Sequence, residues 1–433
     1  MKKYLLIFII LFSLAFCVCG PAPNAETTVK TLTLASVGRN RELANWVNAF
    51  NSSNAGIQIE FIDYSTGDPD PHDALNRLKV EIVSGKGPDL VDLGYYYSPL
   101  DASSGILLDL YPFFENDSGF NKEDYFYNII ESFAVGNGLY VLVPVFTVKT
   151  FTTVDPLLNG RDGVDVNTLM DIYENRNEGV ILYPGETKND VLSRIVHGSM
   201  PNYVDWDSGK CRFDSECFMG LLEFANQFPS TLVLAEDYSI QSIFMDGGAI
   251  LYPGGITSVF DITSTKLFLG EPLTFIGHPM DAGNGNMAQR GDIAIGISSS
   301  SKNQEEAWEF IKSFLSADFQ DNIDYGLPVS RTALNDLLTS AMQTEYDGKG
   351  EKIAKDYVRF DGDALINIYG ITAEDADLLL ALIKKVEFNS STDYFLQQII
   401  NEEADYFFND GRSAEDTATI IQNRASLYLS ENK

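Results

Sequence analysis

The residues of this 433-residue chain that are best suited to binding a ligand are three consecutive tyrosines, Tyr95, Tyr96 and Tyr97. They directly follow GKGPDLVDLG, residues 85–94, which is typical of a turn and a short buried strand. A tyrosine ring can stack on the C–H face of a sugar while its hydroxyl bonds the sugar's rim. Because side chains alternate along an extended segment, we expect one or two of the three to face a ligand and the rest to pack beneath the loop.

Catalytic chemistry has no comparable signal. The three histidines, His72, His197 and His278, are far apart in the chain and none has the spacing of a metal site. The chain contains no Gly-x-Ser-x-Gly motif, so its sequence does not indicate a serine hydrolase. A secreted glycosidase with two carboxylates remains the alternative, since acidic residues are numerous, but no motif points to it. We expect no cofactor, and from the motifs alone a binding protein and a glycosidase both remain open.

The elements that must position the tyrosines follow a strand, helix, strand, helix, strand order. Hydrophobic spacing predicts strands at residues 31–36 and 57–64, a turn and a third strand within residues 85–94, and helices at residues 42–50 and 73–83. This order is typical of a parallel α/β sheet, in which ligands collect beyond the carboxyl ends of the strands. The loops after Ser36, Tyr64 and Gly94 are thus the first places to expect a site, and Tyr64 joins the candidates.

A second informative stretch runs from Gly291 to Leu334. Ile293, Ile295 and Ile297 alternate with small residues as in a buried strand, and residues 304–315 carry apolar side chains at helical spacing. Gly326 and Pro328 then end a further helical segment, because glycine tolerates a left-handed conformation and proline cannot continue a helix.

The sequences of these segments resemble those of the extracellular solute-binding proteins of bacterial ABC sugar importers, the maltose-binding type. The resemblance is carried by the segments SKNQEEAWEFIKSFLS with GLPVS, GKGPDLVDL with SSGILLDL, GNGLYVLVPV, FMDGGAILYPGGI and the C-terminal EEADYFFNDGRSAEDTATIIQNRASLYL. It is weakest at residues 151–203 and 339–393. It implies a two-lobed α/β fold of the periplasmic-binding-protein type II class, with a hinge and a central ligand cleft.

The resemblance also implies how the chain divides between lobes. It gives an N-terminal lobe of residues 27–143 plus 288–330 and a C-terminal lobe of residues 145–287 plus 331–433. The chain would then cross between the lobes three times, and a hinge at the crossings would close on a ligand. The length of the chain suits two such domains.

Further site residues are implied by the same resemblance. Arg39 follows the first strand, where the family places polar contacts, although a solvated surface arginine is the alternative. In the second lobe, Gly255 and Thr257 match the family's glycine-containing loop, which brings the backbone close to ligand. Weaker candidates are Glu186, after the apolar VILYP segment, and Asn286 and Arg290, before the last crossing.

The N-terminal segment predicts export. Residues 1–19 have two lysines followed by an apolar run, which is typical of a signal peptide and short for a spanning helix. Cys19 before Gly20 resembles the lipid-modified cysteine of a bacterial lipoprotein, although Val18 departs from the small residue usual before it. Lipid anchoring at Cys19 is our expectation, and cleavage to a secreted protein is the alternative.

The charge of the chain and its cysteines limit the partners and the covalent links to be expected. Acidic residues outnumber basic ones by 62 to 30, so we expect no nucleic-acid partner. Cys211 and Cys217 are the cysteines left after the signal peptide, and an exported protein permits either a disulfide between them or two thiols.

We therefore expect a monomeric receptor on the outer face of a bacterial membrane. It would capture a small solute, in the first instance a mono- or oligosaccharide, and deliver it to ABC transporter permease subunits. A polyamine or a phosphorylated polyol is the alternative ligand, since members of the family differ in what they bind.

Overall fold

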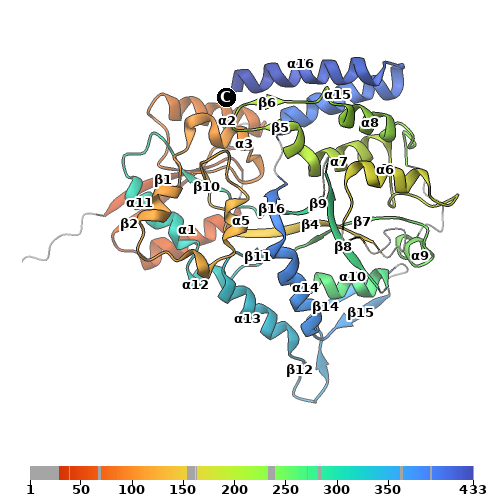
Figure 1. Ribbon diagram of the computed structural model, residues 1–433. Coiled ribbons are helices and arrows are strands. Elements are labelled where there is room, and N and C mark those ends of the chain that lie inside the picture. The colour runs from red at the N-terminus through yellow and green to blue at the C-terminus, as the bar shows by residue number, and fades with distance from the viewer. Residues whose placement is uncertain are drawn as a thin grey trace, which may run out of the picture.

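The computed structural model describes residues 29–38, 40–66, 70–153, 161, 163–232, 239–270, 272–280, 284–360, 364–390 and 393–432. Two β-sheets organise this part of the chain, and helices pack around both of them (Figure 1). The α/β class predicted from the strand and helix order is therefore confirmed. No helix in these ranges combines the length and the apolar character needed to cross a membrane.

The first sheet has four strands in the order β10-β3-β1-β2. Their bounds are β1 Lys30–Ser36, β2 Ile57–Asp63, β3 Leu90–Asp92 and β10 Ile295–Ile297. β1 pairs in parallel with β2 and β3, and β10 is antiparallel to β3. The parallel strands were predicted from the local pattern, whereas β10 reaches this sheet from a distant part of the chain.

The two longest helices beside the first sheet, α1 and α2, begin at the polar caps Asn40 and Asp70 and bury an apolar stripe. In α1, the Asn40 side chain accepts a hydrogen bond from the Leu43 N–H, and Leu43, Val47 and Phe50 are buried. The helical segments here are α1 Arg41–Ser53, α2 Pro71–Val83, η1 Gly94–Tyr96, α3 Pro99–Asp101, η2 Ala102–Ile106, α4 Tyr111–Asn116, η3 Lys122–Asp124, α5 Tyr127–Glu131, α11 Gln304–Ser313 and α12 Ala317–Gln320.

The second sheet has six strands and is built around β4. Its order is β11-β4-β8-β9-β16, with β7 also pairing with β4. The bounds are β4 Val145–Thr153, β7 Tyr252–Ile256, β8 Thr274–Pro279, β9 Asn284–Arg290, β11 Leu327–Pro328 and β16 Val386–Asn389. β4 is antiparallel to β7, β8, β9 and β11, so this sheet depends on pairings between segments far apart in sequence.

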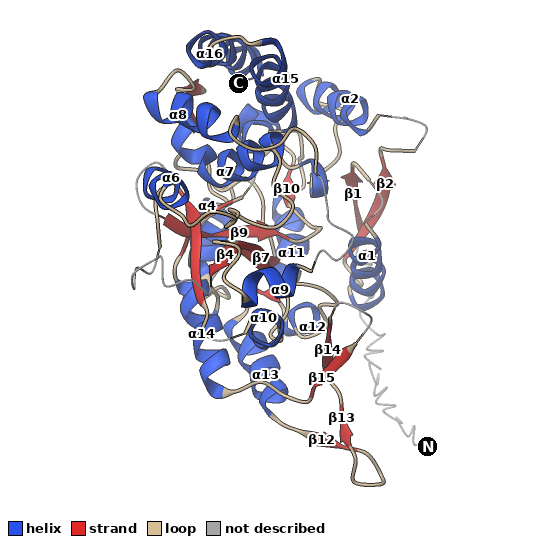
Figure 2. Ribbon diagram, turned by 90° about the vertical axis from the view of Figure 1, so that its right-hand side faces the viewer, coloured by secondary structure: helices blue, strands red, loops and turns tan. Residues whose placement is uncertain are grey.

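The remaining elements surround the second sheet (Figures 1 and 2). The helices are α6 Val166–Glu174, α7 Lys188–Tyr203, α8 Glu216–Ala225, α9 Ile240–Met245, α10 Asp261–Leu269, α13 Arg331–Met342, α14 Ala373–Lys384, α15 Tyr394–Asp410 and α16 Ala414–Asn432. Short strand pairs are β5 Val204–Asp205 with β6 Lys210–Cys211, β12 Glu345–Tyr346 with β13 Lys352–Ile353, and β14 Asp356–Arg359 with β15 Leu365–Ile368.

The two main hydrophobic cores meet at α3. One core surrounds the first sheet and continues through β4, β9 and β16 of the second sheet to α13 and α14, and the other lies among α6, α7, α8, α15 and α16. Leu100 of α3 is fully buried and belongs to the second core, although its neighbours in sequence pack with the first. Helix α16 extends along one side of the molecule from α8 to the region of α2 and α3 (Figure 1). The chain after the tyrosine loop thus joins the two halves of the molecule.

Gln320 connects segments at two of the predicted crossings. It is 1% exposed, and its Nε2 donates to the carbonyl oxygens of Pro144 (3.0 Å) and Phe314 (2.8 Å). Its Oε1 accepts from the Ser330 N–H at 2.8 Å. The predicted lobe boundaries at residues 143–145, 287–288 and 330–331 remain a prediction; β9, which spans the second of these, lies in the second sheet.

Candidate functional site

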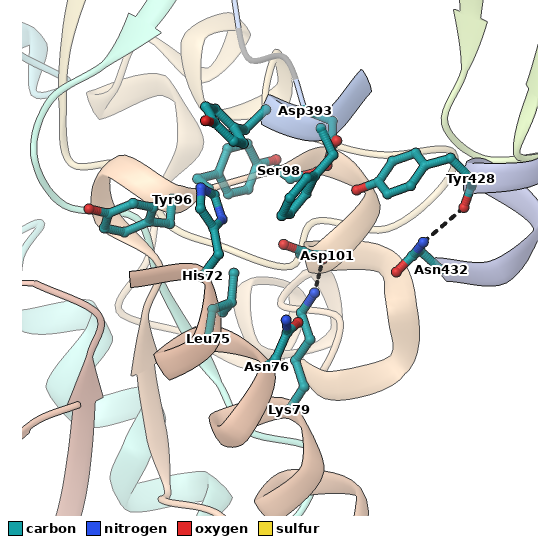
Figure 3. Close-up of a pocket in the computed structure, with 13 residues that line it drawn as sticks. His72, Leu75, Asn76, Lys79, Tyr96, Ser98, Asp101, Asp393, Tyr428 and Asn432 are labelled. Atoms are coloured by element: carbon teal, nitrogen blue, oxygen red, sulfur yellow. Dashed lines mark hydrogen bonds and ion pairs between the residues drawn. The ribbon is translucent and has the colours of Figure 1, made fainter. Parts of the chain in front are cut away.

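An aromatic cavity of about 400 Å³ lies between α2, the tyrosine loop after β3, and the ends of α15 and α16 (Figure 3). Rings supply much of its wall, namely His72, Tyr96, Tyr97, Tyr394, Phe395 and Tyr428. The remaining lining residues are Leu75, Asn76, Lys79, Ser98, Asp101, Asp393 and Asn432. We call this space the aromatic cavity. It presents ring faces and hydrogen-bonding groups together, as the binding of a polar solute with C–H faces requires.

Asp92 holds the loop that carries the tyrosines. Its carboxylate is 1% exposed and accepts hydrogen bonds from the N–H groups of Ala294 (3.0 Å) and Gly94 (3.2 Å) and from the Ser36 hydroxyl (3.0 Å). Gly94 has a φ of 46°, a left-handed conformation that favours glycine. Burial raises the pKa of Asp92 to about 6, and the three hydrogen bonds oppose that rise. The chain therefore turns directly after β3 and directs Tyr96 and Tyr97 to the cavity.

Asp393 fixes the opposite wall. Its Oδ1 caps α15 by accepting from the Leu396 N–H at 3.0 Å, and its Oδ2 accepts from the Ser98 hydroxyl at 2.8 Å. Ser98 also caps α3 through the Leu100 N–H. One carboxylate thereby ties the start of α15 to the tyrosine loop, and Tyr394 and Phe395 come next to it in sequence.

The tyrosine candidates differ in their burial and in their contacts. Tyr96 is half-buried, and its ring meets the His72 ring edge-on with centroids 5.5 Å apart. Tyr97 is 3% exposed and donates to the Phe133 carbonyl oxygen at 3.3 Å, so it packs beneath the loop as expected for part of the triplet. The side chain of Tyr95 lies outside the described residues.

Tyr64, another predicted position near the first sheet, does not line this cavity. The Tyr64 hydroxyl donates to Glu81 Oε2 at 2.6 Å, and burial and this bond raise the pKa of Tyr64 to about 12. Its hydroxyl is therefore hydrogen-bonded within the first core, and the binding role of Tyr64 stays a prediction. Arg39 lies outside the described residues, although a Cβ placed on the preceding Gly38 would lie 3.7 Å from Tyr96 Cε2.

A second cavity, of about 620 Å³, lies over the second sheet between β4, β7, β8, β9 and α7. We call it the basic cavity. Its charged or titratable lining residues are Lys149, Arg194, His197, Tyr252 and His278, and its lining contains no aspartate or glutamate. Thr147, Thr150, Phe151, Ser193, Pro253, Gly254, Gly255, Thr257 and Gln289 complete the wall. The predicted candidates Gly255 and Thr257 are thus brought to a cavity, but a different one from Tyr96 and Tyr97.

Strand register and one glycine form the basic cavity. Lys149 is paired across the sheet with Gly255 on β7, so no side chain opposes it there. Gly198 lets α7 approach β8, because a Cβ at this position would come within 2.5 Å of His278 Nδ1. The backbone and hydroxyl of Thr257 bind Asp261 Oδ2, which fixes the loop after β7 at the rim.

The charges around the basic cavity act on one another. Burial and the nearby Arg194 and Arg290 guanidinium groups lower the pKa of Lys149. Burial and the Lys149 charge lower the pKa of His197 to about 4, and burial lowers that of His278 to about 3. Both imidazoles are therefore neutral near pH 7, and the Lys149 side chain lies in a partly desolvated setting.

Arg290 acts electrostatically on residues at both cavities. Its charge opposes the burial that raises the pKa values of Tyr97 and Asp92, and it also acts on Lys149. Its Nη1 donates to the Gly291 carbonyl oxygen at 3.2 Å. This predicted residue thus connects the tyrosine loop electrostatically with the second sheet.

Two predicted candidates have structural roles instead. Glu186 is 9% exposed and accepts from the N–H groups of Leu182 (2.8 Å) and Tyr183 (3.0 Å), so its carboxylate closes a turn. Asn286 is 3% exposed, and its amide donates to the Leu382 carbonyl oxygen at 3.2 Å. Neither lines the two cavities, and their binding roles stay predictions.

Several cavity residues were missed from the sequence. His72, Tyr394 and Phe395 come from helices that only tertiary packing brings to the tyrosine loop. Arg194 and His197 lie on one face of α7 at a spacing that is common on any helix. Of these residues, Lys149 could have been identified from the sequence as a candidate, because it is the single charged residue in the strand Val145–Thr153.

The cysteines are thiols in the structure and not a disulfide, which corrects the first of the two predicted alternatives. Cys211 Sγ lies 3.3 Å from Ser426 Oγ, and the Tyr203 hydroxyl lies 3.9 Å from Cys217 Sγ. Within the described ranges, histidine, cysteine and acidic side chains form no group of three or more that could hold a metal ion.

Comparison with known proteins now bears on this geometry. A model of the family described as bacterial extracellular solute-binding protein matches residues 45–336. No curated protein sequence matches the chain.

Solved structures share the fold at low sequence identity. The chain superposes on a periplasmic oligogalacturonide-binding protein from Yersinia enterocolitica with a TM-score of 0.56 and 16% identity, covering 93% of this chain and 99% of that one. The sugar-binding protein MalE from Xanthomonas citri gives 0.54 and 16%, covering 93% and 98%. A Thermotoga lettingae ABC transporter solute-binding protein bound with α-D-tagatose gives 0.51 and 15%, covering 92% and 100%. The predicted two-lobed periplasmic-binding-protein fold is confirmed.

Proposed function

Since the chain belongs to the bacterial extracellular solute-binding protein family, we propose that it captures a carbohydrate between its lobes for an ABC transporter. Members of this family are transport receptors and not catalysts, and the extracellular description places the protein outside the cytoplasm. The glycosidase alternative is therefore set aside.

The observation that carries the carbohydrate proposal is the aromatic cavity. It places the half-buried Tyr96 opposite Tyr394 and Phe395, which are supplied by a different part of the chain. Ring faces exclude water from the C–H face of a sugar, and Asn76 and Asn432 offer donors and acceptors for its hydroxyls. A solute held by both walls favours the state in which both sets of contacts exist at once.

The structural neighbours support this class of ligand. One carries α-D-tagatose, and another is described as binding oligogalacturonides. Both are carbohydrates, and both neighbours cover almost the whole of this chain. We extend the carbohydrate class, and not either particular sugar, to this protein.

The proposal includes the route of delivery. A signal peptide of residues 1–19 and a lipid on Cys19 would hold the receptor at the outer face of the membrane, beside the permease subunits that take its solute. Lobes of residues 27–143 plus 288–330 and 145–287 plus 331–433 would close on the solute. The Gln320 hydrogen bonds to Pro144 and Ser330 support a hinge near two of the crossings.

The test is calorimetry of the mature protein against neutral sugars, sugar acids, sugar phosphates and polyamines, with small-angle scattering on the best ligand. We expect a carbohydrate to bind and to reduce the radius of gyration. Tyr96→Ala should weaken binding by about 5- to 100-fold, which corresponds to roughly 1–3 kcal/mol of lost apolar contact. Tyr346→Ala is the matched control, because Tyr346 is 59% exposed on a distant hairpin. Binding of a polyamine but of no carbohydrate would refute the ligand class.

A further inference from the structure

We propose that the basic cavity binds the negatively charged group, a carboxylate or a phosphate, of an acidic sugar solute. This inference deepens the proposed function and rests on it, because it specifies the charge of the carbohydrate that the receptor captures. The cavity is built from the second sheet and α7, and its volume of about 620 Å³ can hold a sugar-sized group.

The first argument is the contrast between the cavity and the rest of the chain. The protein has 62 acidic and 30 basic residues, so an average hollow on it should contain carboxylates. The basic cavity contains none, while Lys149, Arg194 and two histidines line it. A cavity with one sign of charge and low-dielectric walls focuses its field and concentrates ligands of the opposite sign.

The second argument is the state of Lys149. Among the described residues, its ammonium group has no hydrogen-bond or ion-pair partner, although the side chain is only partly exposed. The charges that act on it belong to Arg194 and Arg290 and are both positive. Asp190 already accepts from Arg194 Nε at 3.0 Å, and Asp190 does not line the cavity. Desolvating an ammonium beside two guanidinium groups is costly, and a bound anion would offset that cost.

The third argument is the set of groups around Lys149. Thr147 and Phe151 lie on the same face of β4 as Lys149, and Gln289 lies opposite Thr147 on β9. Gly255, opposite Lys149, leaves the space above the ammonium open, since a Cβ there would meet only the Val148 carbonyl oxygen, at 3.5 Å. His197 Nε2 is buried and has no hydrogen-bond partner. Hydroxyl, amide and ammonium donors thus surround one open space, as a carboxylate or phosphate requires.

A cationic ligand does not fit this cavity. A polyamine needs carboxylates or carbonyl oxygens around each ammonium group, and it would be repelled by Lys149 and Arg194. A neutral sugar could accept hydrogen bonds from the same donors, but it would leave the Lys149 charge uncompensated. The geometry therefore favours an anionic sugar over both.

The experiment measures affinity by calorimetry for three matched classes of probe: neutral hexoses, the corresponding uronic acids, and the corresponding hexose phosphates. Inorganic phosphate and putrescine are added as ligands without a sugar. The proteins are the wild type, Lys149→Met, Lys149→Arg and Lys302→Met. Lys302 is exposed outside both cavities, so Lys302→Met removes the same charge from elsewhere on the chain.

We expect an acidic sugar to bind most tightly. Lys149→Met should weaken that binding by about 10- to 100-fold, as for the loss of a charge-assisted hydrogen bond. Lys149→Arg should retain most of the affinity, and Lys302→Met should change it by less than about twofold, as for a distant screened charge. Preference for a uronic acid identifies the anion as a carboxylate, and preference for a hexose phosphate identifies it as a phosphate.

The two proposals fail differently. If a neutral sugar binds most tightly and Lys149→Met does not weaken binding, the anion site is overturned and the carbohydrate function stands. If no sugar binds but inorganic phosphate binds the wild type and not Lys149→Met, the anion site stands and the carbohydrate function is overturned. Binding of putrescine alone overturns both. Circular dichroism of each variant shows whether a loss of binding reflects unfolding.

Discussion

The imidazole ring of His72 stacks on the ring of Tyr394, with centroids 4.5 Å apart and planes inclined by 25°. His72 is in the first turn of α2 and Tyr394 begins α15, so one ring pair joins helices that flank the aromatic cavity from opposite sides. Phe395 also contacts the His72 ring, at 4.8 Å. We expect this contact to hold the two predicted lobes together when a solute is bound.

Replacing His72 tests that relationship. We expect His72→Ala to reduce carbohydrate affinity by about 2- to 10-fold, because aromatic pairs contribute roughly 0.5–1.5 kcal/mol and this one is partly exposed. His72→Phe keeps a ring and should retain most of the affinity. Calorimetry gives the affinity, and scattering shows whether the liganded variant remains more open. Equal affinity for His72→Ala and the wild type would remove the ring pair from the closure mechanism.

Gln320 offers a test of the segments that join the two sheets. Gln320→Ala leaves the Ser330 N–H and the Pro144 and Phe314 carbonyl oxygens without this partner. We expect a loss of about 2–3 kcal/mol in the free energy of unfolding, since each unsatisfied buried group costs about 1–3 kcal/mol. Gln304→Ala, at an exposed position on α11, should cost less than about 0.5 kcal/mol. Urea unfolding of both variants measures the difference, and similar losses would contradict the role of Gln320.

The pH dependence of the unfolding free energy should show that the pKa of His197 is lowered in the folded protein. Its pKa is lowered from 6.5 to about 4 in the folded protein, so the unfolded chain takes up a proton first as the pH falls. The stability due to the neutral imidazole is therefore present above pH 6.5 and is lost between pH 6.5 and 4, with a total on the order of 3 kcal/mol. His197→Asn should flatten the slope of unfolding free energy over this window.

Glu186 should change the unfolding free energy with pH in the opposite direction to His197, between about pH 4.5 and 7. Burial raises its pKa from 4.5 to about 7, so the folded state takes up the proton first as the pH falls. The contribution of Glu186 is therefore present below pH 4.5 and is lost as the pH rises through 7. Glu186→Gln should remove that loss, in the opposite direction to His197→Asn. The same slope for both variants and the wild type would show that neither group has a shifted pKa.

The predicted anchor at Cys19 is tested by fractionation. Wild-type protein should partition with membranes, and Cys19→Ala should release it, because the acyl chains supply the membrane affinity. A wild-type protein found in the soluble fraction after export would support the secreted alternative.

The cysteines give a simple chemical test. Alkylation of the denatured, unreduced protein should modify both Cys211 and Cys217, since both are thiols in the structure. In the native protein Cys211 should react slowly, because burial raises its pKa and the thiolate is the reactive form. If mass spectrometry shows that neither cysteine was alkylated before reduction, the result would support the disulfide alternative.

The sequence by itself determined the class of fold and the loops at which to look. Apolar periodicity is a local property, so the strands and helices around the first sheet could be predicted from residues 31–94, and the order of motifs indicated the family. The position of Tyr96 and Tyr97 directly after a buried strand placed them beside a cavity, and Gly255 and Thr257 were likewise found at one.

Tertiary structure alone decided how these residues are grouped. The second sheet pairs β4 with strands more than a hundred residues away, and that register sets Lys149 opposite Gly255. The carboxylate of Glu186 and the amide of Asn286 are used by nearby backbone groups, which no residue type reveals. Tyr394 reaches the tyrosine loop only because Asp393 binds Ser98 across 295 positions of the chain. Local patterns fix which face of an element is apolar, whereas long-range pairing fixes which faces meet.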